Sequence, residues 1–513
     1  MYSRIFQSGL IIGGLAFVQA LPGLSSSDPQ ETYSGSGHQG ASPVVASSAE
    51  LDGVKYLNKG LVAFGYIPSD FKDSTGDTLG GYGSAIALKR GSWKEGRDGT
   101  FSGVLLTQPD RGYNVDKTVN YQARQHEISF VLEPYYGSRK LSFRDAAETF
   151  KLKYLKTTLM YERQHKSTSG LDPNAVRSQA AGLGDPVLPI VAESDPRLSL
   201  DVEGLVANKD GSYWISDEYG PYIYRFSKDG DILQAIQPPN AILPRNNTGG
   251  LNFTSAINPT TGRQPNQGLE NLTIDESTGT LYAMLQSATI QDGGTSKATS
   301  RYTRLLAYDI SNGEEENPKL KGEWVVPLPQ KSNGNTLACS EIHFVSENVF
   351  LALSRDGDAK GGDDAKAKYK NADLFSIASA TDIHGTKFDS PDSPIAIGGQ
   401  LDTSITPATY VPFVDYLSKT DLARFGLHNG GDIDQGLINS KWESFALAPV
   451  GDKSSPDDYF LITASDNDFM TTHGVSIGQP YNATLDVDNQ IFAFRVTLPS
   501  VPRGSIENSI GLH

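Results

Sequence analysis

The sequence predicts an all-β protein made of repeats of one strand pattern. In each repeat a glutamate opens a short apolar strand, a turn follows, and a second apolar strand runs into a polar cluster. The clearest repeat starts at Glu203 and runs through the turns 208–211 and 227–230 to Ile236, which gives four strands joined by hairpin-type turns. Repeats of one four-stranded antiparallel unit are typical of a β-propeller.

Further repeats begin at Glu270, Glu341 and Glu443, and another has Ser84 where the others have glutamate. Their predicted second strands are 281–287, 349–355 and 459–466, and their third strands are 304–310, 372–377 and 490–496. Residues 395–447 leave room for one more repeat. We therefore predict a propeller of about six antiparallel four-stranded blades, within a range of about five to seven. A strand near 61–67 would complete the last blade and close the ring.

The first twenty residues predict a secretory signal peptide. They contain Arg4, an apolar run over residues 10–18 and a small-residue site that ends at Ala20. The run is too short to span a bilayer. We therefore assign residues 1–20 to the signal peptide and expect a secreted protein with no membrane partner.

Composition sets the remaining boundaries and excludes some partners. Residues 21–50 are rich in Ser, Gly and Pro and predict a disordered leader, 51–500 a single propeller domain, and 501–513 a tail. The chain has 60 Asp and Glu against 44 Lys and Arg, a net charge of −16. Such a balance argues against nucleic acid as a partner, because binding to phosphate backbones needs basic surface. We expect a monomer.

Cysteine and glycosylation signals agree with this assignment. The chain has one cysteine, Cys339, which excludes a disulfide within the chain. Four Asn-x-Ser/Thr triplets are candidate sites for N-glycans: Asn246, Asn252, Asn271 and Asn482. Asn271 adjoins the strand that Glu270 opens, so folding could enclose it and prevent its modification.

Acidic residues recur at matched places in the repeats. The first strand of each propeller blade lines the central channel, so equivalent glutamates would converge there. These residues are Glu203, Glu270, Glu341 and Glu443. Carboxylates that meet are costly without a cation among them, and calcium accepts irregular sets of oxygen ligands. We therefore predict a calcium site, to which Asp466 and also Asp217 and Asp468 add oxygens. The same glutamates could instead accept hydrogen bonds from backbone amides and hold the blades together, and the pattern does not separate the two roles.

Four residues at the ends of second strands are candidate catalytic groups. Arg111 and Arg355 would pair with the carboxylates or receive an anionic substrate group. Glu218 or Asp217 would orient a water molecule. No Gly-x-Ser-x-Gly elbow and no phosphate-binding Gly-x-x-x-x-Gly-Lys-Ser/Thr loop occurs in the sequence, which disfavours those two mechanisms.

Four motifs carry a resemblance to a known family. They are SDEYGPYIYRF at 216–226, NQGLE at 266–270, LSRDG at 353–357 and ASDNDF at 464–469. Together they resemble the phytase-like domain family, often labelled "esterase-like activity of phytase", over roughly residues 60–499. The resemblance implies a propeller, secretion and a link to calcium-dependent propeller phytases, which hydrolyse phosphomonoesters. The Arg-His-Gly motif of histidine acid phosphatases is absent, so phosphatase chemistry would need water activated by a metal.

Two functions follow from these observations. The first is a secreted phytase-like hydrolase of small anionic phosphate esters or carboxylate esters, with a metal-assisted site at the channel mouth. The alternative is a non-catalytic extracellular propeller that binds a ligand. Strictosidine-synthase-like or lactonase-like chemistry is a third possibility that rests on architecture alone.

Overall fold

The computed structural model describes residues 43–113, 117–178, 184–313 and 317–512. These residues belong to one compact unit, Gly40–His513. The predicted signal peptide and most of the predicted leader lie outside the described residues. No helix in the described ranges is long and apolar enough to cross a membrane.

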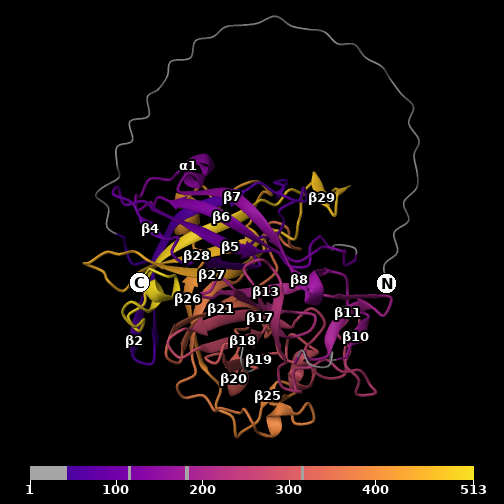
Figure 1. Cartoon of the computed structure of the whole chain (residues 1–513). Helices are drawn as coiled ribbons and strands as arrows, with labels where there is room; N and C mark the ends of the chain where they lie inside the picture. Colours follow the sequence, from indigo (N-terminus) through magenta and orange to yellow (C-terminus); the bar gives the residue numbers. More distant parts are fainter. Residues whose placement is uncertain (1–42, 114–116, 179–183, 314–316, 513) are drawn as a thin grey trace, which may run out of the picture. The chain divides into compact units, whose positions relative to one another are not determined.

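The described chain is all-β and folds into antiparallel sheets (Figure 1). Four sheets follow one another along the sequence. The first contains β3 (Ala85–Leu88), β5 (Phe101–Gln108), β6 (Arg124–Leu132) and β7 (Phe150–Leu159), with β4 (Lys94–Glu95) beside β5. The second contains β13 (Val202–Ala207), β14 (Tyr213–Asp217), β15 (Ile223–Phe226) and β16 (Ile232–Ile236). The third contains β17 (Leu269–Asp275), β18 (Thr280–Leu285), β19 (Tyr302–Asp309) and β20 (Lys319–Pro327). The fourth contains β21 (Ala338–Ser346), β22 (Val349–Arg355), β23 (Lys370–Ser376) and β26 (Thr409–Asp415).

The fifth sheet joins the two ends of the described chain. It has the order β1 (Ser47–Leu51), β2 (Val54–Ile67), β31 (Asn489–Thr497), β28 (Asp458–Asp466) and β27 (Lys441–Pro449). The pairing of β2 with β31 confirms that a strand near 61–67 completes the last repeat. A long strand from the start of the domain therefore ties its beginning to its end through backbone hydrogen bonds.

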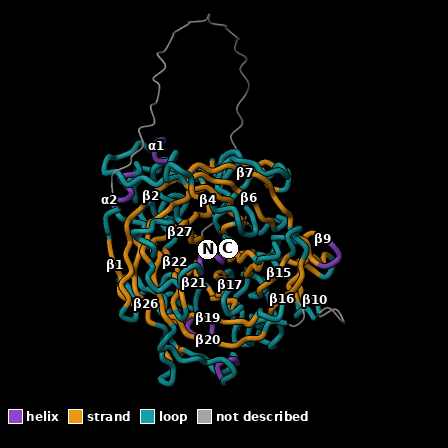
Figure 2. Tube along the Cα trace, turned by 60° about the vertical axis from the view of Figure 1, so that its left-hand side comes forward, coloured by secondary structure: helices purple, strands orange, loops and turns teal. Residues whose placement is uncertain are grey.

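The first strands of the five sheets contact one another in a closed cycle. β3 contacts β13, β13 contacts β17, β17 contacts β21, β21 contacts β27, and β27 contacts β3. In Figure 2, β17 and β21 lie nearer the middle of the view than the outer strands β16, β20 and β26. Residues at matched positions of the first strands are therefore brought together from different sheets.

The repeat expected within residues 395–447 is not formed, so the described residues contain five sheets of this kind where six were expected. This segment instead supplies β24 (Ala396–Ile397), β25 (Gln400–Leu401), the outer strand β26 and the helix α2 (Lys419–Arg424). Val414 and Leu422 are buried in the largest apolar cluster, with Trp442 and Phe492. The apolar residues that suggested another repeat therefore cover existing sheets.

Short elements occupy the connections. They are α1 (Phe143–Ala147), β8 (Tyr161–Glu162), η1 (Arg163–His165), β9 (Lys166–Ser167), β10 (Ala175–Arg177), β11 (Leu188–Ala192), β12 (Asp195–Leu198), η2 (Ile290–Gly294), η3 (Lys387–Asp389), β29 (Gly474–Ser476), β30 (Gln479–Tyr481) and α3 (Ser505–Ser509). Two of the predicted boundaries differ from the structure. The end of the predicted leader 21–50 forms most of β1, and the predicted tail 501–513 contains α3.

Candidate functional site

A β-bulge interrupts the first strand in the sheets that carry the recurring glutamates. The pairing of β17 with β18 skips Glu270, and that of β27 with β28 skips Glu443. In β13 the skipped residues are Glu203 and Gly204. A bulge re-aims the extra residue away from the regular alternation of the strand. Three of the four glutamates among the predicted metal ligands therefore occupy the same structural position in three sheets.

Glu341 does not occupy this position, so its predicted equivalence to the other three glutamates is wrong. The skipped residue of β21 is Ser340, whereas Glu341 pairs with Leu353. Oε1 of Glu341 accepts hydrogen bonds from the amides of Leu272 at 3.0 Å and Ile342 at 2.8 Å. Burial raises the pKa of Glu341 well above its ordinary value. Its role is the alternative that the sequence left open, an acceptor for backbone amides that joins two sheets.

Spacing to the next core residue distinguishes Glu341 in the sequence. Leu205, Leu272 and Phe445 each follow their glutamate by two positions, whereas Ile342 follows Glu341 directly. Because side chains alternate along a strand, a shift of one residue turns a side chain to the other face.

Three carboxylates meet beside the bulges. Ligand oxygens of Asp201, Glu203 and Glu218 all lie within 4.8 Å of one another. The three residues are only 2%, 6% and 2% exposed. Glu218 follows the end of β14, and its amide donates to the carbonyl oxygen of Asp201 at 3.0 Å. Burial, reinforced by the charge of Asp201, raises the pKa of Glu218 to about 7.

Glu270 extends this group of acids. Burial and the charges of Glu218 and Glu443 raise its pKa well above the ordinary value. Among the described residues, Oε1 of Glu218 and Oε2 of Glu270 have no hydrogen-bond partner. No ion pair joins Glu203, Glu218 or Glu270 to a basic side chain in the part of the chain that the structure describes. We call Asp201, Glu203 and Glu218 the first acidic trio.

A second acidic trio consists of Asp110, Asp466 and Asp468, whose ligand oxygens also lie within 4.8 Å of one another. This trio already holds a cation. Nζ of Lys441 lies 2.8 Å from Oδ2 of Asp466, 2.7 Å from Oδ1 of Asp468 and 3.6 Å from Oε1 of Glu443. Asp466, predicted as a metal ligand, therefore forms an ion pair with lysine. Burial raises the pKa of Asp110 to about 7.

Both predicted arginines lie against carboxylates of these groups. Nη1 of Arg111 is 3.2 Å from Oδ2 of Asp201. The guanidinium of Arg355 is paired with Glu443, and its Nε donates to Oγ of Ser340 at 3.1 Å. The structure therefore shows both arginines paired with carboxylates, which is one of the two roles that the sequence suggested for them.

Both carboxylate oxygens of Asp217, which was predicted as a catalytic residue, accept hydrogen bonds from backbone amides. Its Oδ2 accepts from the amide of Asp201 at 2.8 Å, and its Oδ1 accepts from the amide of Gly220 at 2.9 Å. The side chain is buried. Asp217 thus fixes the turn that carries Glu218, and Glu218 is left as the acid that could orient water.

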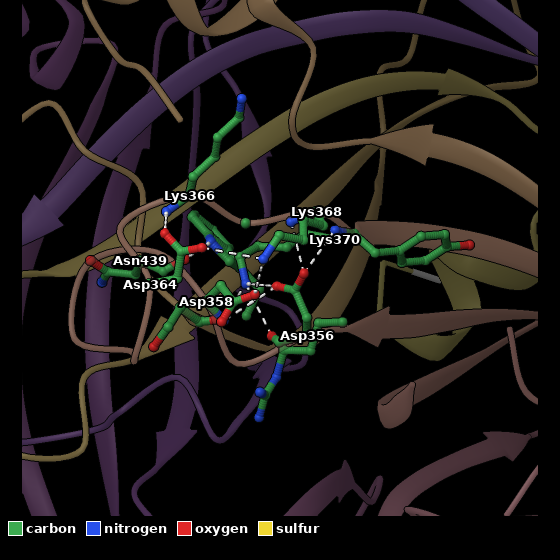
Figure 3. A network of polar contacts seen from close by, with 12 residues as sticks. Asp356, Asp358, Asp364, Lys366, Lys368, Lys370 and Asn439 are labelled. Atoms are coloured by element: carbon green, nitrogen blue, oxygen red, sulfur yellow. Dashed lines mark hydrogen bonds and ion pairs between the residues drawn. The ribbon is translucent and has the colours of Figure 1, made fainter. Parts of the chain in front are cut away.

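Buried Lys370 binds the backbone next to Arg355 and Lys441 (Figure 3). Nζ of Lys370 donates to the carbonyl oxygen of Asp356 at 3.1 Å, to Oδ1 of Asp356 at 3.3 Å, and to the carbonyl oxygen of Ser440. Asp356 follows Arg355 and Ser440 precedes Lys441, so one ammonium fixes the backbone beside two cations of the site. Burial lowers the pKa of Lys370 to about 7.

Sequence reasoning missed Asp201, Asp110 and Lys441. Asp201 and Lys441 each stand two residues before a bulge glutamate, which is the same place in two repeats. Asp110 directly precedes Arg111. These spacings were available signals.

Comparisons with known proteins agree with the resemblance in the motifs. Residues 99–469 match the phytase-like family, described as "Esterase-like activity of phytase". The chain is 38% identical over 461 residues to an "Uncharacterized secreted protein" of Arthroderma benhamiae, covering 82% of this chain and 89% of that protein. The crystal structure of Saccharomyces cerevisiae Sqt1 aligns over 85% of this chain and 99% of its own, with 8% identity and a TM-score of 0.26, too low to support any argument. The chain therefore belongs to the phytase-like family.

Proposed function

We propose that this protein is a secreted hydrolase of phosphate or carboxylate esters, whose site is centred on Asp201, Glu203 and Glu218. The observation that carries the proposal is the first acidic trio, whose carboxylates are buried together while Glu218 keeps an oxygen with no partner among the described residues. Membership of the phytase-like family supports hydrolysis. The name of the secreted Arthroderma relative supports secretion.

We also infer that the five sheets are the blades of a β-propeller. The closed cycle of contacts among their first strands supports this arrangement. The bulges at matched positions of the first strands in three sheets support it as well. The acidic groups would then lie at the axis, where the loops of several blades meet.

The donor set fits a hard divalent cation, and calcium is the proposed one. Calcium takes about six to eight oxygen ligands at about 2.3–2.6 Å, often from carboxylates in irregular geometry. Oxygens within 4.8 Å of one another can belong to one such coordination sphere. Asp201, Glu203 and Glu218 would hold the ion, and Glu270, which lies beside Glu218, could complete the set. When bound, the ion would supply Lewis acidity and activate water at neutral pH.

The protein's own residues would divide the remaining work. Glu218, with a pKa raised to about 7, would accept a proton from the attacking water and then donate it to the leaving alkoxide of the ester. Arg111 would hold Asp201 in place and present its guanidinium to the anionic group of the substrate. Arg355 would hold the carboxylate of Glu443 in place.

Access to the site suits a small substrate group. The side chain of Asp468 is 41% exposed and that of Lys441 is 22% exposed, so they mark the open side. The acids of the first trio are almost completely enclosed. A terminal phosphate or a short acyl ester would therefore reach the site more easily than a bulky internal ester.

The decisive assay compares matched glutamate variants. Purified protein would be incubated with phytate, p-nitrophenyl phosphate and short acyl esters, with calcium or with chelator. The variant Glu218→Gln, and the triple variant that adds Asp201→Asn and Glu203→Gln, should lose turnover, as should chelation. Glu341→Gln is the matched control, since this glutamate is equally buried but bound to backbone amides. If the turnover of the wild-type protein is no higher than that of the triple variant, the proposed hydrolase activity is refuted.

A second candidate function is the non-catalytic binding of an extracellular ligand. It is favoured by a cavity of about 1250 Å³ along the first strands, apart from the acidic trios. Its wall includes the residue two positions after each bulge residue or Ser84: Ile86, Leu205, Leu272, Ile342 and Phe445. An uncharged fluorescent probe such as N-phenyl-1-naphthylamine should bind in this cavity. The substitution Ala207→Phe narrows the cavity and should weaken binding of the probe. Absence of probe binding would exclude this function, and hydrolysis by the protein would make it secondary.

A further inference from the structure

Among the described residues, three cations form ion pairs with the acids of the two trios and with Glu443, and they do not share these acids evenly. Arg111 pairs with Asp201 and Arg355 pairs with Glu443. Lys441 alone contacts three carboxylates, those of Asp466, Asp468 and Glu443. The position of its ammonium group is therefore the one that an independent cation would take.

We infer that Lys441 is an internal cation that fills a second divalent-cation site built from Asp110, Asp466 and Asp468, with Glu443 beside it. The native protein would then bind one divalent ion, in the first acidic trio, and keep the second position permanently occupied by its own ammonium group. The first half of this statement rests on the proposed function, whereas the second half stands on the contacts of Lys441.

The second trio is held in shape by its surroundings. Oδ1 of Asp466 accepts the amide hydrogen of Asp468 at 2.6 Å, which leaves Oδ2 for Lys441. Asp468 has a φ of 52°, in the left-handed region, so the turn brings its carboxylate back toward the lysine. A side chain at Gly81 would place its Cβ 1.8 Å from Oδ1 of Asp466, so only glycine permits this close packing. The acids thus stay in place through contacts that do not depend on Lys441.

Distances and ligand chemistry allow exchange of the ammonium group for a metal ion. The N–O distances of 2.7 and 2.8 Å exceed calcium–oxygen distances of about 2.3–2.6 Å by only a few tenths of an ångström. Without the lysine, Asp466 and Asp468 would lose their ion-pair partner, and their mutual repulsion is costly until an ion binds. The partly exposed Asp468 leaves a path for that ion.

The test is a count of calcium ions bound per chain, measured by equilibrium dialysis and by terbium luminescence titration on the full mature protein. Wild type should bind one ion, Lys441→Met two, and the double variant Lys441→Met with Asp466→Asn one. Lys59→Met is the matched control, because Lys59 is paired with buried Asp458 at 2.6 Å outside either trio. The Lys59→Met protein should bind one calcium ion per chain, as wild type does.

Each outcome decides the inference. A Lys441→Met protein that gains no ion, or a wild type that binds two, would overturn it. If wild type binds none and Lys441→Met binds one, the internal cation stands and the metal site of the proposed hydrolase fails. If Lys441→Met unfolds in chelator, a larger rise of its Tm on adding calcium than in the double variant with Asp466→Asn supports the inference, and an equal rise overturns it.

Discussion

Nε of Arg304 lies 2.7 Å from Oδ2 of Asp292, and neither side chain is exposed. The same guanidinium binds Glu323 through Nη1 at 2.7 Å. Asp292 also accepts the amide of Ile395 at 2.8 Å, and Arg304 donates to the carbonyl oxygen of Phe388 at 2.9 Å. One buried arginine therefore fastens the long insertion after β23 to the third sheet.

Replacing this arginine should destabilise the protein strongly. Arg304→Met leaves two buried carboxylates without their cation, which typically costs about 3–5 kcal/mol. Urea denaturation at neutral pH would measure the loss of unfolding free energy. Arg503→Met, which removes a mostly exposed arginine paired with Asp457 at 3.3 Å, should change it by less than about 0.5 kcal/mol. Equal effects of the two variants would contradict the structural role of Arg304.

Glu341 and Glu270 should respond differently to the same substitution. Glu341→Gln keeps an oxygen to accept the two amides, so calcium affinity should be unchanged. Glu270→Gln removes a charge next to the first trio and should weaken calcium binding at least about tenfold, which is about 1.4 kcal/mol. Isothermal titration calorimetry would compare the two. An equal loss of calcium affinity in Glu341→Gln would indicate that Glu341 belongs to the metal site.

Truncation of Glu341 tests its structural role. Glu341→Ala leaves the amides of Leu272 and Ile342 without an acceptor, which should cost about 1–3 kcal/mol of unfolding free energy. Denaturant titration of the variant in chelator would measure it. No loss of stability would mean that water or another group serves these amides equally well.

Calcium-free protein should lose stability as the pH rises from about 4.5 to 7. Glu218 has its pKa raised from 4.5 to about 7, so the folded state binds more protons than the unfolded state in that window. Its contribution is complete below pH 4.5 and is lost as the pH passes 7. Denaturation curves in chelator from pH 5 to 8 would show the decline, and Glu218→Gln should make it shallower. Calcium affinity should change in the opposite direction, rising with pH as the carboxylates ionise.

N-glycans should occupy some of the four predicted sites and not others. Asn482 is exposed and Asn246 is half-buried in an exposed loop. Asn271 is fully buried, and its Nδ2 donates to the carbonyl oxygens of Met284 at 3.0 Å and Cys339 at 3.1 Å. Mass spectrometry of the secreted protein after enzymatic deglycosylation should find Asn246 and Asn482 modified and Asn271 unmodified. A glycan on Asn271 would be incompatible with the packing of β17 against β21.

The comparison of sequence and structure is clearest at the bulges. Alternating apolar residues and turns predicted the first strands and the glutamates of three sheets correctly, because that pattern is local. The same pattern grouped Glu341 with them, and the one-residue difference in spacing to Ile342 is a weak signal in a short apolar strand. The strand pairing shows that Ser340 takes the bulge position.

By itself the sequence determined the all-β class, the recurring strand unit, the use of the strand near 61–67 to complete the last sheet, and membership of the phytase-like family. Only the tertiary structure decided which acids share a space and which cation each one meets. Asp110, Asp201 and Lys441 lie far apart in the chain, and no local pattern records that Lys441 pairs with two acids of one trio while Glu218 and Glu270 form no ion pair among the described residues. The physical reason is that charge pairing depends on distances of a few ångströms between sheets, which are fixed by the packing of the whole domain.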